Sequence, residues 1–248
     1  MNLLITNDDG VDAPGIDALA AALAEVGHVW IVAPEREQSA QSHAFTLHKP
    51  LRVTRRGPRR IALSGTPADC AYAGIHGLVP TPDFVVSGIN RGANLGNDVH
   101  YSGTVAGARE AVLQGVPSMA VSLYIRGENK DEHHWDCAAR VAREVLKKRL
   151  SARFPADAFL NVNVPNVPYA SLAGIRAVPL GRRRYTSMVE VRTDPRGNEY
   201  AWIGGKPMPD EPSGSGDVVM AQQGWATVTP MHTTPTSPDL IEVVNAWF

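Results

Sequence analysis

Residues 3–33, with the sequence LLITNDDGVDAPGIDALAAALAEVGHVWIVA, decide the fold class. The stretch opens on a short apolar run, residues 3–6, which is typical of a buried strand. Pro14 can begin a helix, and apolar side chains then recur at helical spacing until Gly27 ends it. Residues 28–33 form a second apolar run. A strand, a crossover helix and another buried strand predict a parallel βαβ unit.

The same alternation of helix-like and strand-like segments continues to about residue 165. Further helices are predicted over residues 67–79, 103–114 and 131–150, and further strands over 83–87, 117–123 and 159–164. Residues 1–165 are therefore expected to form a Rossmann-like, doubly wound α/β core built on a mostly parallel sheet.

Residues 166–248 follow a different pattern. Strand-like pieces, separated by turns with no helix between them, are expected near 175–178, 185–191, 200–203 and 225–228. Hairpins of this kind cannot bury both faces alone, so they should pack on the core or on a neighbouring subunit. We expect a mobile loop over 207–216 and a short helix over 238–248. Residues 166–248 should thus complete the fold and supply an oligomer interface.

Composition excludes several classes of protein. The chain has 248 residues, with 24 Lys and Arg against 25 Asp and Glu, so 24 − 25 gives a net charge of −1. A balanced charge argues against a stable nucleic-acid partner. Cys70 and Cys137 lie far apart, which argues against a disulfide scaffold or a zinc knuckle. The sequence shows neither a signal peptide nor an apolar run long enough for a membrane span, so we expect a cytoplasmic protein.

The first of three polar clusters, residues 7–10 (Asn-Asp-Asp-Gly), directly follows the first predicted strand. Open α/β sheets bind ligands beyond the carboxyl ends of their strands, where the strand order reverses. Gly10 would let the chain leave the sheet so that both Asp8 and Asp9 could face a ligand. The alternative is an Asx turn in which Asp12 caps the helix that begins at Pro14.

The second cluster, residues 87–96, has the sequence SGINRGANLG and follows the strand over 83–87. Its glycines allow backbone to approach a ligand, and Asn90 and Asn94 offer amide oxygens. The spacing does not match the G-x-G-x-x-G dinucleotide fingerprint. An ordinary glycine-rich turn is the alternative.

The third cluster, residues 101–104 (Tyr-Ser-Gly-Thr), opens a predicted helix. Free backbone N–H groups at a helix N-terminus, beside hydroxyl groups, can bind phosphate. The same residues could equally serve as a helix N-cap. Ser39, in the linker after the second strand, could bring another hydroxyl to the same crevice.

Together these clusters would offer two carboxylates, a hydroxyl and an amide oxygen. Hard oxygen ligands suit Mg²⁺, Mn²⁺ or Ca²⁺ better than zinc or copper. A divalent cation that faces a phosphate cradle indicates phosphoryl chemistry.

The motifs also carry a family resemblance that runs in order across nearly the whole chain. They are NDDGVDAPG at 7–15, APEREQS at 33–39, GTPADC at 65–70, SGINRGANLG at 87–96, YSGTV at 101–105, DPRGN at 194–198 and GWATVTP at 224–230. This set resembles the SurE family. The resemblance implies a three-layer, Rossmann-like catalytic core with C-terminal β-hairpin extensions. It also implies a homodimer or homotetramer assembled through those hairpins.

The same resemblance implies a metal-dependent phosphatase that acts on nucleoside 5′- and 3′-monophosphates, and leaves open whether short polyphosphate is also cleaved. Carried over by position, the ligands of one divalent ion, Mg²⁺ or Mn²⁺, would be Asp8, Asp9, Ser39 and Asn90. The phosphate would be bound by Asn90, Asn94, Ser102, Gly103 and Thr104. The catalytic residues would be Asp8, Asp9 and Asn94.

Two mechanisms and one non-enzymatic function are compatible with these residues. We expect direct attack of water on the phosphomonoester; a phosphoaspartyl intermediate on Asp8 or Asp9 is the rival. The third hypothesis is a nucleotide- or RNA-binding protein without catalysis, supported by arginines at 55–60 and 182–184. The sequence favours a solvated hairpin turn for the first arginine run, while the second could reach substrate across a subunit boundary. Three histidines near the crevice are expected to be structural rather than substrate-binding: His43, His48 and His100.

Overall fold

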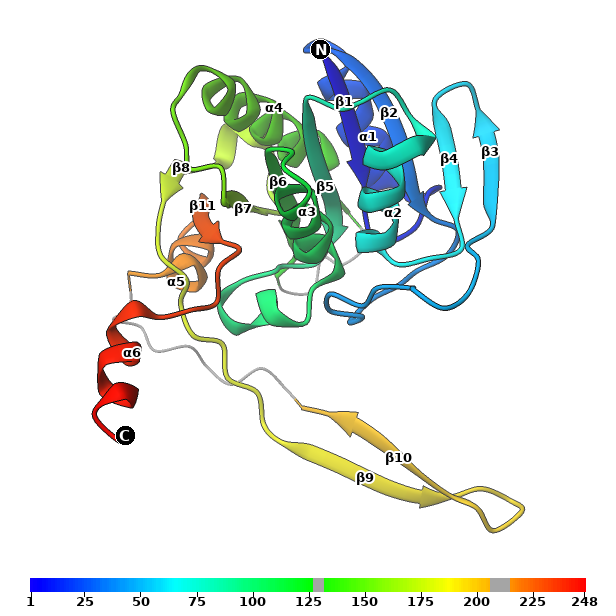
Figure 1. The fold of residues 1–248 in the computed structure, drawn as a ribbon, viewed down its shortest axis with the longest axis vertical. Helices are drawn as coiled ribbons and strands as arrows, with labels where there is room; N and C mark the ends of the chain where they lie inside the picture. Colours follow the sequence, from blue (N-terminus) through cyan, green and yellow to red (C-terminus); the bar gives the residue numbers. More distant parts are fainter. Residues whose placement is uncertain (127–131, 206–214) are drawn as a thin grey trace.

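The computed structural model describes residues 1–126, 132–205 and 215–248 (Figure 1). Within them, the main sheet has nine strands in the order β3-β4-β2-β1-β5-β6-β7-β11-β8. These strands are β1 (Asn2–Thr6), β2 (His28–Pro34), β3 (Val53–Gly57), β4 (Arg60–Leu63), β5 (Phe84–Arg91), β6 (Ser118–Tyr124), β7 (Ala158–Pro165), β8 (Gly174–Ala177) and β11 (Trp225–His232). Neighbours pair in parallel except for β3 with β4 and β7 with β11. The predicted mostly parallel α/β fold is confirmed.

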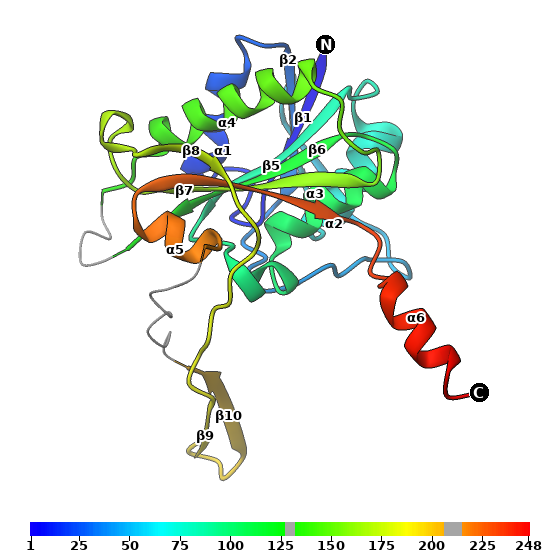
Figure 2. The same cartoon turned by 90° about the vertical axis from the view of Figure 1, so that its left-hand side faces the viewer.

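Helices cover both faces of this sheet and give the molecule three layers. They are α1 (Pro14–Leu23), α2 (Pro67–Ala73), α3 (Gly103–Leu113), α4 (Trp135–Ser151) and α5 (Asp217–Gln222); a further helix, α6 (Pro238–Asn245), lies off the sheet. Shorter turns are η1 (Gly74–Leu78), η2 (Gly96–His100) and η3 (Tyr169–Ser171). Helix α1 packs on α4, and α2 packs on α3 on the opposite face of the sheet (Figure 2). The largest core cluster fills the layer between α1, α4 and the sheet.

The strand order reverses beside β1, which fixes where a ligand can bind. From β1 the chain adds β2 on one side, and later adds β5, β6 and β7 on the other. Strand β1 pairs in parallel with both β2 and β5. The carboxyl ends of β1 and β5 therefore flank the topological switch point, where open α/β sheets bind their ligands.

Several local predictions differ from the structure. Helix α4 begins at Trp135 rather than at 131, which lies outside the described residues. The predicted helix over 67–79 changes at Gly74 from an α-helix to a π-helix. Strand β5 does not stop at Ser87 but continues to Arg91, so Asn90 lies within the strand.

The largest error concerns the region after residue 165. We expected no helix between its strands, but α5 lies between β10 and β11. Strands β8 and β11 join the main sheet because β11 pairs with both β7 and β8. The arginines at 55–60 do form the predicted hairpin, between β3 and β4. Most of the loop expected over 207–216 lies outside the described residues.

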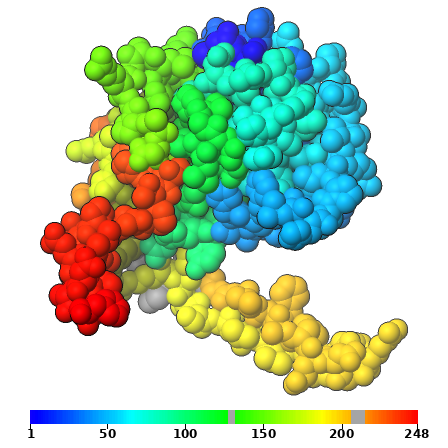
Figure 3. All heavy atoms as spheres, viewed as in Figure 1, coloured from blue at the N-terminus to red at the C-terminus, as the bar shows by residue number. Residues whose placement is uncertain are grey.

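Two segments project from the body of the molecule. Strands β9 (Met188–Thr193) and β10 (Glu199–Gly204) form a separate antiparallel hairpin. Helix α6 extends from the end of β11, away from the sheet (Figures 1 and 3). In the described residues, no helix is long and apolar enough to cross a membrane.

Close packing of α1 against β5 sets the position of the switch point. Gly15, in the first turn of α1, is buried against the backbone of Ile89. A Cβ atom built on Gly15 would overlap the carbonyl oxygen of Ile89. The contact joins the first turn of α1 to β5 at the point where the pairing of β5 with β6 is irregular, between Ser87 and Asn90.

We therefore predict that Gly15→Ala lowers the free energy of unfolding by about 1–3 kcal/mol, as overpacking does, although alanine favours helix formation. Urea denaturation measures the change. Gly57→Ala is the matched control, since no atom lies within 4 Å of the added Cβ. Equal stability of the two variants would contradict this account of the packing.

Candidate active site

The turn that follows β1 is closed by the side chain of Asn7. Its amide oxygen accepts the Gly10 N–H at 3.2 Å, and its amide nitrogen donates to the Gly10 carbonyl at 2.9 Å. Gly10 has a φ of +107°, which glycine adopts far more readily than other residues. The Asx turn considered from sequence is thus present. Its expected cap is wrong, because the N-cap of α1 is Ala13 and no side chain caps it.

Asp8 lies at the end of this turn and faces the N-terminus of α3. Its side chain is 4% exposed, and its Oδ1 accepts the Thr104 hydroxyl at 2.5 Å. A Cβ atom on Gly103 would lie 3.1 Å from the Cβ of Asp8 and 3.2 Å from its Oδ2. Glycine at 103 therefore allows the helix to approach the carboxylate closely.

The N-cap alternative for the third cluster is confirmed. Ser102 is the N-cap of α3, and its hydroxyl accepts the Val105 N–H at 3.0 Å. Thr104 is fully buried and bonds Asp8 rather than facing open space. The predicted phosphate cradle is therefore partly occupied by a carboxylate of the chain itself.

Burial dominates the electrostatics of Asp8. Desolvation raises its pKa from 3.8 to about 6, and the neighbouring charge of Asp9 adds to the rise. The hydrogen bond from Thr104 opposes it. A carboxyl group with a raised pKa in a cleft is a recurring feature of functional sites.

Asp9 faces a different direction from Asp8. One of its oxygens, Oδ2, accepts the backbone N–H of Arg91 at 2.9 Å. Its pKa is raised, first by burial and then by the charge of Glu37. Asp9 lines a neighbouring cavity of about 380 Å³ that also includes Arg91 and Trp135.

Asn94 is fixed by a buried polar network. Its backbone N–H donates to Asn163 Oδ1 at 2.8 Å, and its carbonyl accepts the side-chain amides of Asn161 at 2.8 Å and Asn163 at 3.0 Å. Its own side-chain amide donates to the Ser122 hydroxyl at 2.7 Å. Sequence reasoning missed these supporting residues. The detectable signal was asparagine at alternate positions of an otherwise apolar strand, β7.

Most of the predicted site residues meet at one cavity of about 790 Å³ at the switch point. Five of them line it: Asp8, Ser39, Asn90, Asn94 and Ser102. Asp9, Gly103 and Thr104 do not, since Asp9 lies on the adjoining cavity and the other two are buried behind Asp8.

Two of the lining side chains have local hydrogen bonds. The amide nitrogen of Asn90 donates to the carbonyl of Gly92 at 2.9 Å. The hydroxyl of Ser39 donates to Glu37 at 2.7 Å. The oxygen of the Asn90 amide and the hydroxyl oxygen of Ser39 are the atoms of these groups that can accept or coordinate.

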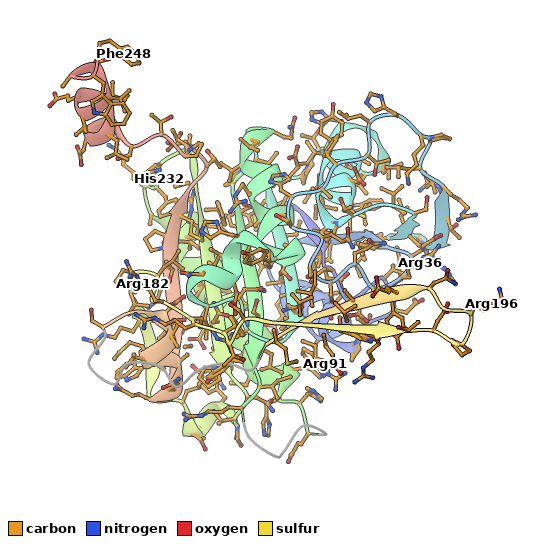
Figure 4. All side chains as sticks on the ribbon, turned by 90° about the horizontal axis from the view of Figure 1, so that it is seen from below. Arg36, Arg91, Arg182, Arg196, His232 and Phe248 are labelled. Carbon is orange, nitrogen blue, oxygen red and sulfur yellow. The ribbon has the colours of Figure 1, made fainter. Side chains whose placement is uncertain are left out.

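The far wall of the cavity was missed from sequence. It comprises Asn97, Asp98, Tyr101, Arg183 and the base of the hairpin, including Tyr185, Met188, Val189 and Ile203. Arg183 forms an ion pair with Asp98, and the Tyr185 hydroxyl bonds the same carboxylate at 2.9 Å. Of the arginine run at 182–184, Arg183 thus lines a cavity of its own chain. Figure 4 shows the hairpin extending past Arg91 on this side of the molecule.

None of the three histidines near the crevice faces the cavity, and two of them form hydrogen bonds with residues outside it. His43 bonds Glu110 at 2.8 Å, and His100 offers its carbonyl to Ser42. His48 is exposed. None of the three lines the 790 Å³ cavity.

A parallel sheet whose switch point carries a buried carboxylate, two asparagines and a helix N-terminus defines a Rossmann-like α/β protein with its ligand site at that point. The family model described as survival protein SurE matches residues 3–187. The chain belongs to the SurE family, and the resemblance of its motifs is confirmed.

Relatives and a solved structure agree over the full length. The chain is 48% identical to the 5′-nucleotidase SurE of Geobacter sulfurreducens over 250 residues, which covers 100% of this chain and 94% of the relative. It is 44% identical to the 5′-nucleotidase SurE of Geotalea daltonii, covering 100% and 99%. The crystal structure of the SurE protein from Aquifex aeolicus superposes with a TM-score of 0.88 at 35% identity, covering 100% and 99%.

The raised pKa of Asp8 predicts how stability depends on pH in metal-free protein. Because the folded-state pKa is about 6 and the ordinary value is 3.8, ionisation of Asp8 costs stability progressively as pH rises from about 4 to 6. Asp8→Asn should therefore increase the free energy of unfolding at pH 8 by about 1–3 kcal/mol, since one pKa unit is about 1.4 kcal/mol.

Urea denaturation in the presence of a chelator, at pH 4 and pH 8, measures this difference. The gain should shrink to below about 1 kcal/mol near pH 4, where Asp8 is protonated in the folded protein and only partly ionised in the unfolded chain. Asp12→Asn is the control, because Asp12 is an exposed carboxylate beside the same turn. A gain of equal size at both pH values would contradict the assignment to Asp8.

Proposed function

We propose that this protein is a metal-dependent 5′-nucleotidase that hydrolyses nucleoside monophosphates to nucleoside and phosphate. The observation that carries the proposal is the cavity at the switch point, which brings Asp8, Ser39, Asn90, Asn94 and Ser102 together. Full-length relatives at 44–48% identity are named 5′-nucleotidase SurE, which supports the same substrate class.

The donor groups suit a hard divalent cation. The described residues contain no group of three or more His, Cys, Asp or Glu side chains that could hold a metal. In the proposed site the cation is held by Asp8, Ser39 and Asn90, which line the cavity, together with the carboxylate of Asp9 from the adjoining cavity. Such a donor set fits Mg²⁺ or Mn²⁺ rather than zinc. Burial first, and neighbouring carboxylates second, raise the pKa values of Asp8 and Asp9, and a bound cation would favour their ionised forms.

When bound, the cation would polarise the phosphoryl group and stabilise the charge that develops during hydrolysis. The residues of the chain orient the reactants. Asn94 is held rigidly by its network, and Ser102 fixes the first turn of α3 beside the phosphate. Asp8 and Asp9 are the candidates to accept a proton from the attacking water. A phosphoaspartyl intermediate remains the rival, and detection of a phosphorylated Asp8 or Asp9 would replace the water mechanism.

The size of the cavity supports a nucleotide rather than a bare phosphate. A volume of about 790 Å³ falls within the range of roughly 300–1,000 Å³ that small-molecule sites occupy. Asp8 and the asparagines line its inner end, and Tyr101, Tyr185 and Ile203 contribute aromatic and apolar surface elsewhere. We place the phosphate at the inner end and the nucleoside against these side chains. The same arrangement would accept 3′-monophosphates, and short polyphosphate could follow the polar inner wall.

The rival hypothesis of RNA binding without catalysis has weaker support. The arginines at 55–60 lie on the β3–β4 hairpin at one edge of the sheet, whereas the cavity lies at the central switch point. Arg60 is paired with Asp17, and Arg59 lies over the ring of Trp30. These contacts account for two of the arginines without a nucleic acid.

The proposal predicts phosphate release from nucleoside 5′-monophosphates that requires Mg²⁺ or Mn²⁺ and falls by at least about 100-fold in Asp9→Asn, as expected for loss of a catalytic charge. A colorimetric phosphate assay measures the release. Its panel contains 5′- and 3′-monophosphates, ribose 5-phosphate, phenyl phosphate and tripolyphosphate. Asp12→Asn, an exposed neighbour, should retain wild-type rates.

Two results would count against the nucleotidase. Retained nucleotide binding without phosphate release under any metal would favour the binding-protein hypothesis. Equal rates for phenyl phosphate and for the nucleotides would show that the cavity does not recognise the nucleoside part of the substrate.

We further propose that the protein acts as a homodimer or homotetramer. The β9–β10 hairpin exposes apolar side chains on both faces, with Val189, Val191 and Ile203 on one face and Met188, Tyr200 and Trp202 on the other. Helix α6 and the residues after it expose a second set: Leu240, Ile241, Val243, Trp247 and Phe248. Large exposed apolar surfaces of this kind mark interaction sites.

This proposal predicts a molar mass of two or four chains for the wild type by light scattering coupled to size exclusion. Val191→Glu should shift the mass toward smaller species, because a charge would be buried in the interface. Arg196→Gln, at the exposed turn between β9 and β10 and outside both apolar faces, is the control. A monomeric wild type would exclude the assembly.

A further inference from the structure

The segment 39–46, which carries Ser39 to the cavity, has an unfavourable backbone conformation. Ala40 and Ser42 have φ values of +58° and +52°. Side chains other than glycine rarely occupy this left-handed region. Such a conformation persists only where surrounding contacts hold it. Contacts outside the segment must therefore keep Ser39 beside the cavity. One holds its start, because the N–H of Gln38 donates to the carbonyl of Asp8 at 2.8 Å, and the others hold the residues that follow Ser39.

One set of hydrogen bonds joins Ser42 and Thr46 of the segment to the core. The Ser42 hydroxyl donates to the carbonyl of His100 at 2.7 Å, and its N–H donates to the carbonyl of Tyr101 at 3.1 Å. Thr46 donates twice to the buried carboxylate of Asp69, each time at 2.8 Å. These bonds fix positions 42 and 46 but leave the residues between them to be held by other groups.

Two contacts lie between these anchors: the Thr66 hydroxyl donates to the carbonyl of Ala44 at 2.7 Å, and the side chain of His43 reaches α3. The Nε2 atom of His43 lies 2.8 Å from Oε2 of Glu110, a carboxylate that is 5% exposed. Glu110 belongs to α3, the helix whose N-terminal Thr104 bonds Asp8. One rigid helix is thus in contact with both the catalytic carboxylate and the Ser39 segment.

The pair is part of a closed ring of side chains. Gln114 donates to Oε1 of Glu110 at 2.7 Å and bonds His76 at 2.8 Å. The His76 ring lies 4.5 Å from the ring of Tyr72. Tyr72 meets Phe45 edge to face at 5.2 Å. The ring therefore leaves the segment at His43, crosses α3 and the α2–η1 helix, and returns to the segment at Phe45.

We propose that His43 and Glu110 are positioning residues: their contact, closed through the ring, holds Ser39 in register with Asp8 for cation and substrate binding. The inference rests on the proposed function, because it assigns Ser39 a ligand role. His43 itself does not line the cavity and touches no reacting atom. It acts through the backbone of residues 39–42.

A purely structural role for the pair makes a different prediction. A contact that only stabilises the fold would lower the melting temperature and leave the conformation of 39–46 and the affinity for cation unchanged in the folded protein. A positioning role requires that loss of the contact loosens residues 39–46 and weakens cation binding while the rest of the molecule stays folded.

The test compares His43→Ala, His43→Gln and His48→Ala in the full chain. His48→Ala is the matched control, since His48 lies in the same stretch and is exposed. Hydrogen–deuterium exchange of residues 39–46 and calorimetric titration with Mn²⁺ alone are measured first. The KM and kcat for a nucleoside 5′-monophosphate follow. Phe45→Ala removes the contact between Phe45 and Tyr72, and it replaces His43→Ala in the test if that variant does not fold.

We expect His43→Ala to speed exchange in 39–46 by at least tenfold, to weaken Mn²⁺ binding by at least tenfold and to raise KM more than it lowers kcat. His43→Gln can still donate to Glu110 and should restore all three values to within about threefold of wild type. Phe45→Ala should change them in the same direction by less.

The proposal is overturned if His43→Ala matches His48→Ala in exchange and Mn²⁺ affinity, or if His43→Gln fails to restore them. Failure of the proposed function is separately visible in the wild type, as absence of Mn²⁺ binding and phosphate release. In that case the exchange data still show whether the contact holds the segment.

Discussion

The site depends on one contact, the hydrogen bond between the Asp8 carboxylate and Thr104 at the start of α3. It joins the carboxyl end of β1 to α3, which packs on the face of the sheet over β5 and β6. Gly103 makes the approach sterically possible, and burial without a full counter-charge raises the pKa of Asp8. Ionisation of Asp8 is therefore unfavourable in the folded chain, and a cation bound in the cavity would make it favourable.

A second buried carboxylate, Asp217, attaches the C-terminal region to this centre. Its oxygens accept the N–H groups of Gly96 at 3.0 Å and Gly181 at 2.7 Å. A Cβ atom on Gly216 would lie 2.6 Å from the Gly181 backbone, so the junction requires glycine at position 216. Gly96 follows Asn94 by two residues. The junction that orders the base of the hairpin therefore also supports the part of the cavity that Asn94 lines. The hairpin beyond it is free to engage another surface.

Much of the fold could be predicted from local pattern. The βαβ unit of residues 3–33 and the later apolar strands were visible because buried parallel strands are continuous apolar runs. Helix α5 was missed because its six residues are too few to show a helical period. The extension of β5 through Gly88 and Asn90 was also missed, since glycine and asparagine ordinarily interrupt strands. Gly88 instead allows the close approach of the Val121 backbone, and Asn90 lines the cavity.

For the site, the sequence by itself determined which polar residues would follow the strands, and hence that Asp8, Asn90, Asn94 and Ser102 would meet. Parallel strands end at one edge of a sheet, so local order along the chain was enough. Only the tertiary structure decided that Asp9 turns to a second cavity and that Thr104 bonds Asp8. It alone revealed that Asn161 and Asn163 support Asn94, and that His43 faces Glu110. These contacts join residues about 67–96 positions apart, and side-chain direction at such separations depends on packing rather than on local spacing.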